Sequence, residues 1–347
     1  MGERVRAQGV GRLVKRSSLT RLAVAVLFAV LGIAGVTGVV QYARTYWLYR
    51  GFAPPNEPAS VAVRSAHGVR FATVRRGTLV TLEVRSPALG NRPEPVLVYL
   101  PPGYFGHPDK SYPVLYLLHG TPGAPINFFR IADIGVLEDV MIAKREIEPM
   151  ILVAPTGSPS VFADTEWVNG VRSDTGWETY VVRGVVTAVD RRFRTIRNGR
   201  GRAIAGLSEG GYGALDMAFH HPGEFDVVES WSGYEWADHV PGVFGAHERP
   251  AMLAYDSPAV QLRRRAAVLR QDHLFVWLYS GARDPLLVQN EHFATELTRY
   301  RIAHRFVIVP GGHDWKVWRS MAGESLLIAS RHLGPATKAT ARGAGHG

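Results

Sequence analysis

Short apolar runs alternate with longer amphipathic stretches through most of this chain, and this alternation constrains the fold more than any other feature. Most runs are apolar throughout, as expected for parallel strands whose sheet is covered by helices on both faces. The strand candidates are residues 96–100, 114–119, 150–155, 203–206, 226–231, 274–280 and 305–310, and the helix candidates are 176–193, 210–221, 286–301 and 315–333. The pattern predicts an α/β fold with a doubly wound, mostly parallel sheet.

The length of the chain favours one large domain between two poorly structured segments. With 347 residues, 46% of them hydrophobic, the chain can bury one sizeable core. Residues 44–68 are rich in proline and small side chains, which indicates a linker. Residues 335–347 have the composition of a flexible tail. We therefore expect the α/β domain to span residues 69–334.

The first 50 residues have the composition of a membrane anchor. They hold eight basic residues and one acidic residue, and most of the basic residues fall in the segment 1–21. Residues 22–40 carry no charge and are long enough to cross a bilayer, so 22–43 is predicted as a transmembrane signal anchor. The preceding positive charge predicts a single-pass cell-membrane protein with a cytoplasmic N-terminus and an extracytoplasmic domain. The alternative is a cleaved signal peptide followed by secretion.

The remaining composition excludes several classes of function. Outside the first 50 residues there are 32 basic and 29 acidic residues, so the net charge of +10 comes mostly from the N-terminal segment. Without a basic patch or a nucleic-acid-binding motif, we expect no nucleic-acid partner. The chain has no cysteine, which excludes disulfides, thiolate metal sites and a cysteine nucleophile.

One serine stands between glycines at a strand-to-helix junction, in the stretch AGLSEGGYGAL (205–215). Ser208 follows a strand candidate and precedes a helix candidate, which is the context of a G-x-S-x-G nucleophile elbow. Side chains at positions 206 and 210 would collide with the sheet and the incoming helix on so sharp a turn. The alternative is a glycine-rich loop without a chemical role.

A serine nucleophile needs a base and an orienting acid, and two candidates lie in suitable places. In an α/β-hydrolase the order along the chain is serine, acid, histidine, each after a strand. Asp284 follows the strand candidate 274–280, and His313 follows the strand candidate 305–310. The predicted catalytic set is therefore Ser208, Asp284 and His313.

Other ionisable residues near strand ends fit different roles. Asp314 opens a helix and is interpreted as its cap. Asp256 and Asp272 are interpreted as turn, cap or strand-entry residues. His119 ends a strand but precedes Ser208, which is the wrong place for the base.

An oxyanion hole needs two backbone donors, one of them from the residue after the nucleophile. Glu209 N–H is the first expected donor. Thr121 N–H is the expected second, because Pro122 has no N–H, and Gly123 is the alternative. This chemistry requires no cofactor and no metal.

Five motifs together resemble a known family. They are VYLPPGY (98–104), YPVLYLLHG (112–120), WETYVVRGVVTAVDRRFRT (177–195), AGLSEGGYGAL (205–215) and GGHDWKVWR (311–319). This set resembles the esterase family of α/β-hydrolases, which includes S-formylglutathione hydrolases, siderophore and feruloyl esterases, and mycobacterial mycolyltransferases. The resemblance covers about residues 69–333. It implies an α/β-hydrolase fold, with Ser208 as nucleophile, Asp284 as acid and His313 as base.

The chain departs from the family pattern at two places. Glu209 stands where many members have a methionine, and Arg183-Gly184 stands where many have a Glu-Leu pair. The first difference could alter the charge at the mouth of the cleft, and the second is interpreted as a surface change.

Substrate-binding residues are harder to assign. An irregular segment between Trp231 and Ala259 could cover the site, and its aromatic residues could form an acyl pocket or could simply pack the segment down. The pocket candidates are Trp231, Tyr234, Trp236 and Phe244. Three loop carboxylates could bind substrate hydroxyls or a cation, although solvated side chains are the favoured interpretation. They are Asp164, Glu166 and Asp174.

The sequence thus predicts a membrane-anchored extracytoplasmic serine esterase or acyltransferase that acts on an ester or acyl-lipid substrate through an acyl-enzyme. The alternative from another class is a catalytically silent member of the fold that serves as an envelope scaffold or ligand-binding protein. A serine peptidase is a third possibility, which the family resemblance disfavours.

Overall fold

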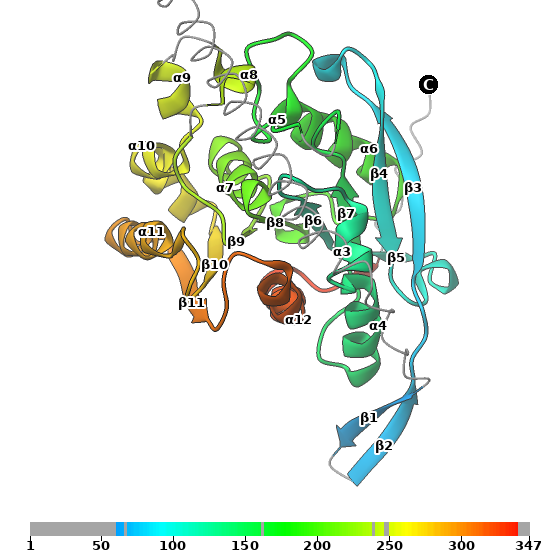
Figure 1. Cartoon of the computed structure of the whole chain (residues 1–347). Coiled ribbons are helices and arrows are strands. Elements are labelled where there is room, and N and C mark those ends of the chain that lie inside the picture. The colour runs from blue at the N-terminus through cyan, green and yellow to red at the C-terminus, as the bar shows by residue number, and fades with distance from the viewer. Residues whose placement is uncertain (1–59, 66–67, 161–162, 238–239, 246–249, 339–347) are drawn as a thin grey trace, which may run out of the picture. The chain divides into compact units, whose positions relative to one another are not determined.

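Strands and helices alternate along the chain in the computed structural model, which describes residues 60–65, 68–160, 163–237, 240–245 and 250–338 (Figure 1). The strands of the large sheet are β3 (Thr78–Arg85), β4 (Pro93–Leu100), β6 (Val114–Leu118), β7 (Ile151–Pro155), β8 (Arg202–Leu207), β9 (Val227–Trp231), β10 (Phe275–Gly281) and β11 (Ala303–Val309). Smaller sheets pair β1 (Ser60–Ser65) with β2 (Gly68–Thr73), and β5 (Lys110–Ser111) with β12 (Thr337–Lys338).

Helices fill most of the connections between these strands. In the described part of the chain the α-helices are α3 (Ile126–Arg130), α4 (Ile134–Lys144), α5 (Trp177–Thr179), α6 (Val186–Arg192), α7 (Glu209–His220), α8 (Pro241–Phe244), α9 (Pro250–Tyr255), α10 (Pro258–Gln271), α11 (Leu287–Arg299) and α12 (Trp315–His332). A π-helix, η4 (Tyr180–Val185), joins α5 to α6, and short 3-10 helices are η2 (Pro87–Leu89), η3 (Tyr104–Gly106) and η5 (Gly199–Gly201).

The large sheet has the strand order β11-β10-β9-β8-β6-β7-β4-β3. Every neighbouring pair from β11 to β7 is parallel. Only β4 is reversed: it is antiparallel to both of its neighbours, β7 and the edge strand β3, so β3 runs in the same direction as the parallel strands. The prediction of a mostly parallel sheet is confirmed.

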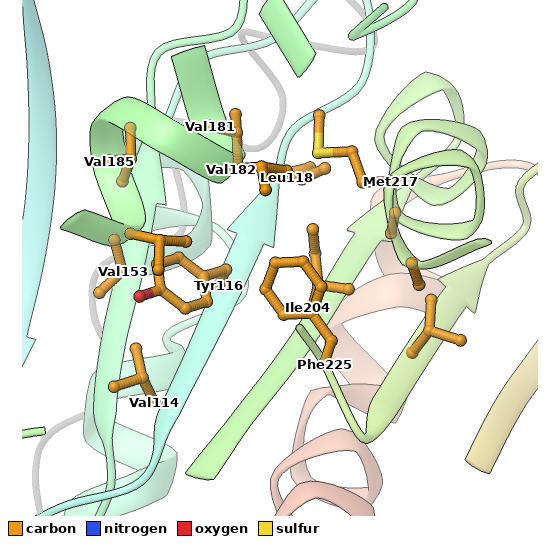
Figure 2. Close-up of a cluster of buried hydrophobic side chains, with 14 of the residues drawn as sticks. Val114, Tyr116, Leu118, Val153, Val181, Val182, Val185, Ile204, Met217 and Phe225 are labelled. Atoms are coloured by element: carbon orange, nitrogen blue, oxygen red, sulfur yellow. The ribbon is translucent and has the colours of Figure 1, made fainter. Parts of the chain in front are cut away.

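Burial on both faces explains why the strand sequences are apolar throughout. In β6, Val114, Tyr116 and Leu118 join one core cluster, together with side chains from η4, β8 and α7 (Figure 2). The alternate residues of the strand, Leu115 and Leu117, are also fully buried. Because neighbouring residues of a strand point to opposite faces, both faces of the sheet are covered.

The second face is covered by α12. In β9, Val228 belongs to the core cluster that contains α7, so the next residue, Glu229, points to the opposite face. There Glu229 is hydrogen-bonded to Ser325 of α12. Helices α12 and α4 contact each other as well. The sheet is therefore wound on both sides, as predicted.

Two short pairings differ from the predicted domain boundaries. Strand β1 lies in the range predicted as a linker (44–68), and β12 lies in the predicted flexible tail (335–347). Each strand pairs antiparallel with a partner segment, and β1 and β2 contact α4. Neither segment has a long apolar run, because a hairpin or a two-residue pairing needs backbone hydrogen bonds rather than a buried face.

No helix of the described ranges is long and apolar enough to span a bilayer. The predicted anchor, residues 22–43, lies outside those ranges.

Candidate active site

Ser208 lies on a sharp turn between β8 and α7. Its backbone has φ 54° and ψ −122°, a strained conformation for a residue other than glycine. A side chain at Gly206 would meet the carbonyl oxygen of Gly210 at 2.1 Å, and one at Gly210 would meet that of Leu118 at 2.0 Å. Only glycines allow the helix to begin so close to the sheet. The steric reason predicted for both positions is therefore present in the structure.

His313 approaches the serine from the loop between β11 and α12. Its Nε2 lies 2.9 Å from Ser208 Oγ. The ring also packs nearly perpendicular to that of Trp318, with ring centres 5.0 Å apart. Gly311 in the same loop has φ 135°, which lets the chain turn back over the end of the sheet.

Asp284 completes a hydrogen-bonded row. Its Oδ2 lies 3.0 Å from His313 Nδ1, and its Oδ1 accepts a hydrogen bond of 2.9 Å from Leu286 N–H. Burial raises the pKa of this carboxyl, but the hydrogen bonds from His313 and Leu286 outweigh burial, and the net shift is downward. An ionised Asp284 requires the proton of His313 on Nδ1, which leaves Nε2 free to accept the hydroxyl proton of Ser208.

The side chain of Glu209 turns toward the loop that follows β6. A hydrogen bond joins its Oε2 to Thr121 Oγ1, and its Oε1 accepts a hydrogen bond of 3.3 Å from Thr165 N–H. Burial, followed by the charge of Asp164, raises the pKa of Glu209 to about 8. The two residues expected to supply oxyanion donors are thus connected through their side chains. Sequence reasoning missed this contact, since no local pattern links positions 121 and 209.

The expected backbone donors have no acceptor within the described part of the protein. This holds for the N–H groups of Thr121 and Glu209, and also for that of Gly123. Glu209 is the first residue of α7, where backbone N–H groups have no partner within the helix. The geometry fits an anion at this helix start, and the choice between Thr121 and Gly123 stays open.

One of the three loop carboxylates differs from the expectation of solvated side chains. Glu166 is buried and hydrogen-bonded to the hydroxyl of Tyr234. Burial and the neighbouring charge of Asp164 raise its pKa to about 9, so this carboxyl is neutral at pH 7. Asp164 is exposed, and Asp174 pairs with arginines. The sequence could not show which loop carboxylate turns inward.

The four predicted pocket aromatics lie in different environments, and Trp231 accepts a backbone hydrogen bond of 2.9 Å from Ser208 N–H. Trp231 and Phe244 are buried, with exposed fractions of 0% and 2%. Tyr234 packs near Phe244 in one apolar cluster, whereas Trp236 is exposed and lies 5.8 Å from the guanidinium of Arg263. The substrate-binding role of these residues stays a prediction.

A cavity of about 300 Å³ opens beside this region. Its lining includes Asp164, Thr165, Arg172 and Trp177, and none of the residues in the hydrogen-bonded row. Thr165 also contacts Glu209 through its backbone N–H. Thr165 thus connects the lining of the cavity to Glu209, the residue after Ser208.

Two other candidates have structural contacts; for Asp314 the contact is the cap expected from sequence. Asp314 caps α12, accepting hydrogen bonds from the N–H groups of Lys316 and Val317. His119 is buried between Gly120 O and Gly157 N–H, each 3.1 Å away. Burial lowers its pKa to about 4, so it is neutral at pH 7 and already committed to backbone contacts.

The sheet order, the turn at Ser208 and the position of the row define a protein with an α/β-hydrolase-like fold. The chain belongs to the Esterase family: the family model, described as "Putative esterase", matches residues 86–326. Esterase Rv1288 of Mycobacterium tuberculosis strain H37Rv is 29% identical over 265 residues, which cover 67% of this chain and 55% of that protein. The chain therefore spans only about half of the length of that relative.

Solved structures give the same fold. A ferulic acid esterase has a TM-score of 0.66 at 25% identity, over 74% of this chain and 98% of that one. The S-formylglutathione hydrolase of Staphylococcus aureus has a TM-score of 0.60 at 20% identity, over 74% and 99% of the two chains. The family resemblance found in the sequence is confirmed.

Proposed function

We propose that this protein is a serine carboxylic-ester hydrolase or acyltransferase in which Ser208, His313 and Asp284 form the catalytic triad. The single observation that carries the proposal is the hydrogen-bonded row of these three side chains, with 2.9 Å and 3.0 Å between their atoms. Membership of the Esterase family supports an ester as the substrate.

The reaction runs through an acyl-enzyme. His313 Nε2 takes the hydroxyl proton as Ser208 Oγ attacks the ester carbonyl carbon, and Asp284 stabilises the imidazolium. The N–H groups of Glu209 and of Thr121 or Gly123 stabilise the oxyanion. The protonated histidine then gives its proton to the leaving alkoxide. A water or an alcohol attacks the acyl-enzyme in the same way, which releases an acid or a new ester.

Replacing the nucleophile tests this mechanism. We expect Ser208→Ala to lower kcat/KM on p-nitrophenyl acyl esters at least about 10³-fold, and to abolish labelling by a fluorophosphonate probe. A matched control is Ser320→Ala, on α12 outside the row, which should retain both. Full activity in Ser208→Ala would contradict the assignment. A wild-type chain that neither turns over esters nor reacts with the probe would support the silent scaffold instead.

Product analysis separates hydrolysis from transfer. The purified protein is incubated with an acyl ester and a sugar or glycerol acceptor. Only an acyltransferase makes the acylated acceptor, because hydrolysis gives the free acid and the alcohol of the original ester. Ser208→Ala should make neither product.

We also propose that residues 22–43 anchor the protein in the cell membrane, with the catalytic domain outside the cytoplasm. The uncharged run at 22–40 and the basic residues before it support this proposal. An acyl-lipid is a substrate that such an anchor would bring within reach. Secretion after cleavage remains the competing outcome.

A further inference from the structure

Four buried ionisable side chains meet around the C-terminal half of α7, away from Ser208. They are Glu178 of α5, Asp216 and His220 of α7, and Asp256 just before α10. At 1.5 Å per helical residue, Asp216 and His220 lie about 12 and 18 Å along α7 from Ser208. We propose that this cluster binds one divalent transition-metal cation, of the Zn²⁺ or Mn²⁺ type, as a structural site.

The spacing of the donor atoms suits a single cation. One donor atom from each residue lies within 4.8 Å of all the others. His220 Nδ1 is 3.2 Å from Glu178 Oε1 and 3.2 Å from Asp216 Oδ2. Tetrahedral ligands at about 2.1 Å from a metal are separated by about 3.4 Å, so small side-chain movements would close the site.

Asp216 points to a ligand independently of this spacing. It is completely buried; within the described ranges its Oδ1 has no partner, and its Oδ2 has only the 3.2 Å contact with His220 Nδ1. In the same ranges His220 Nδ1 also lacks a hydrogen-bond partner, so its 3.2 Å contacts are close without being directed as hydrogen bonds. A buried carboxylate without hydrogen bonds is unfavourable unless a cation compensates for it.

The other nitrogen of His220 has a fixed role. Nε2 lies 2.9 Å from the carbonyl oxygen of Tyr255, which can only accept, so Nε2 carries a proton. The ring stacks on Tyr255, with centres 4.2 Å apart. Metal-binding histidines are commonly oriented in this way, by an N–H donated to a carbonyl. Nδ1 is therefore presented to the three carboxylates.

The donor set indicates the class of cation. Glu178 is held by His221 at 2.7 Å and by the Asn169 amide at 2.9 Å, which orients it toward the cluster. One imidazole with carboxylates suits Zn²⁺ or Mn²⁺, whereas Ca²⁺ and Mg²⁺ prefer oxygen ligands only. A bound cation would connect α5, α7 and the segment before α10.

A proton is the competitor of the metal at Nδ1. Although burial lowers the pKa of His220, the facing carboxylates of Asp216 and Glu178 outweigh burial and raise it to about 11. Asp256 has its pKa raised to about 8 by burial and by the negative charge of Asp216.

Metal binding to the full-length chain tests the proposal. The protein is stripped with a chelator and titrated with Zn²⁺ or Mn²⁺, followed by calorimetry and thermal unfolding. We expect about one equivalent per chain with at least one of these cations, and a rise in Tm of about 5 °C at a hundredfold excess over Kd. Ester hydrolysis by the stripped protein is measured separately, since the site lies away from Ser208.

Two cluster variants and one control make the result specific. Asp216→Asn and Asp256→Asn should each weaken binding at least tenfold, whereas Glu324→Gln, in a surface pair with Arg305, should bind like the wild type. If one of the two variants does not fold, the other still measures the effect of losing a ligand. The proposal is overturned if neither cation raises the Tm of the stripped protein, or if a folded Asp216→Asn binds metal as tightly as the wild type.

Discussion

The side chain of Glu209, the residue after Ser208, makes contacts in addition to the expected role of its backbone N–H. Its buried carboxyl contacts Thr121 Oγ1 and Thr165 N–H, and so connects the start of α7 to the loop after β6. The Thr121 hydroxyl donates to Oε2 and Thr165 N–H donates to Oε1, so one carboxyl holds both loop segments. We infer that this side chain positions the loop that supplies the second oxyanion donor.

Glutamine and alanine at position 209 should behave differently. The amide of Glu209→Gln can replace a neutral carboxyl at both contacts, so kcat should stay within about threefold of the wild type. Glu209→Ala leaves Thr121 and Thr165 without their partner and should lower kcat about tenfold or more, with a smaller change in KM. Steady-state kinetics on a soluble ester measures both.

The pH profile separates positioning from a merely structural role. The pKa of Glu209 is raised to about 8, so above that pH a negative charge forms beside the expected oxyanion donors, and the wild type should lose activity. Glu209→Gln cannot ionise and should keep its activity there. Identical profiles for the two proteins would argue against an effect of the Glu209 charge on the site.

At the scale of elements, the junction between β8 and α7 depends on the absence of one side chain. A Cβ at position 210 would lie 2.0 Å from Leu118 O, and backbone cannot move away cheaply. We expect Gly210→Ala to lower the free energy of unfolding by about 3 kcal/mol or more, or to prevent folding.

Gly106→Ala is the matched control for this substitution. No atom lies within 4 Å of a Cβ at position 106, so its stability should change by less than about 0.5 kcal/mol. Urea unfolding followed by circular dichroism compares the two variants. Equal stabilities would show that the strand and helix can separate at the junction without cost.

The interface between β9 and α12 contains a buried titratable group. Glu229 is completely buried, and burial raises its pKa to about 8, although hydrogen bonds from Ser325 and Trp231 oppose the shift. In an unfolded chain a glutamate titrates near pH 4.3. Between these values the folded protein holds a proton that the unfolded chain has released. The stabilisation is therefore complete below about pH 4 and is lost as the pH rises through 8.

Glu229→Gln should remove this pH dependence. Because the glutamine stays neutral, the wild type should lose stability relative to the variant between pH 5 and pH 8, by at most about 1.4 kcal/mol per pH unit. Urea unfolding of both proteins at pH 5, 6.5 and 8 measures the difference. A difference that stays constant over this range would contradict a raised pKa at Glu229.

Elements were predictable from sequence where both faces are buried. Strands β6 and β7 have apolar side chains on both faces, and their sequences show it. Strand β3 was missed because it is a largely exposed edge strand, and α4 because its polar residues do not segregate from its apolar ones. Glu138 and Asp139 of α4 are buried by tertiary contacts, which the local sequence does not predict.

At the scale of the whole molecule, the meeting of the three candidate residues was predictable from sequence, but the loop contacts around them were not. Ser208, Asp284 and His313 each follow a strand that the sequence reveals, and the shared edge of the sheet brings them together. The contact of Glu166 with Tyr234 depends on a positive φ at Glu166, in a loop without a repeating pattern. Sequence alone offers no signal for such a turn.

The proposed anchor gives a prediction for the intact protein. The full-length chain should sediment with membranes and resist extraction by alkaline carbonate, because an apolar span is held by the bilayer rather than by surface charge. Deleting residues 22–40 should move the protein to the soluble fraction with unchanged kcat on a soluble ester. Release of the full-length chain by carbonate, or a secreted form that begins after residue 40, would contradict an uncleaved anchor.

The wide separation of Ser208, Asp284 and His313 along the sequence has a consequence for folding. Ser208 and His313 are 105 residues apart in sequence, and the base follows the last strand of the large sheet. Sheets built from such distant segments assemble slowly, because the chain must close long loops before the pairings form. During refolding, helix α7 and the serine turn can form well before His313 reaches them. Recovery of esterase activity would therefore time the docking of β11 and α12.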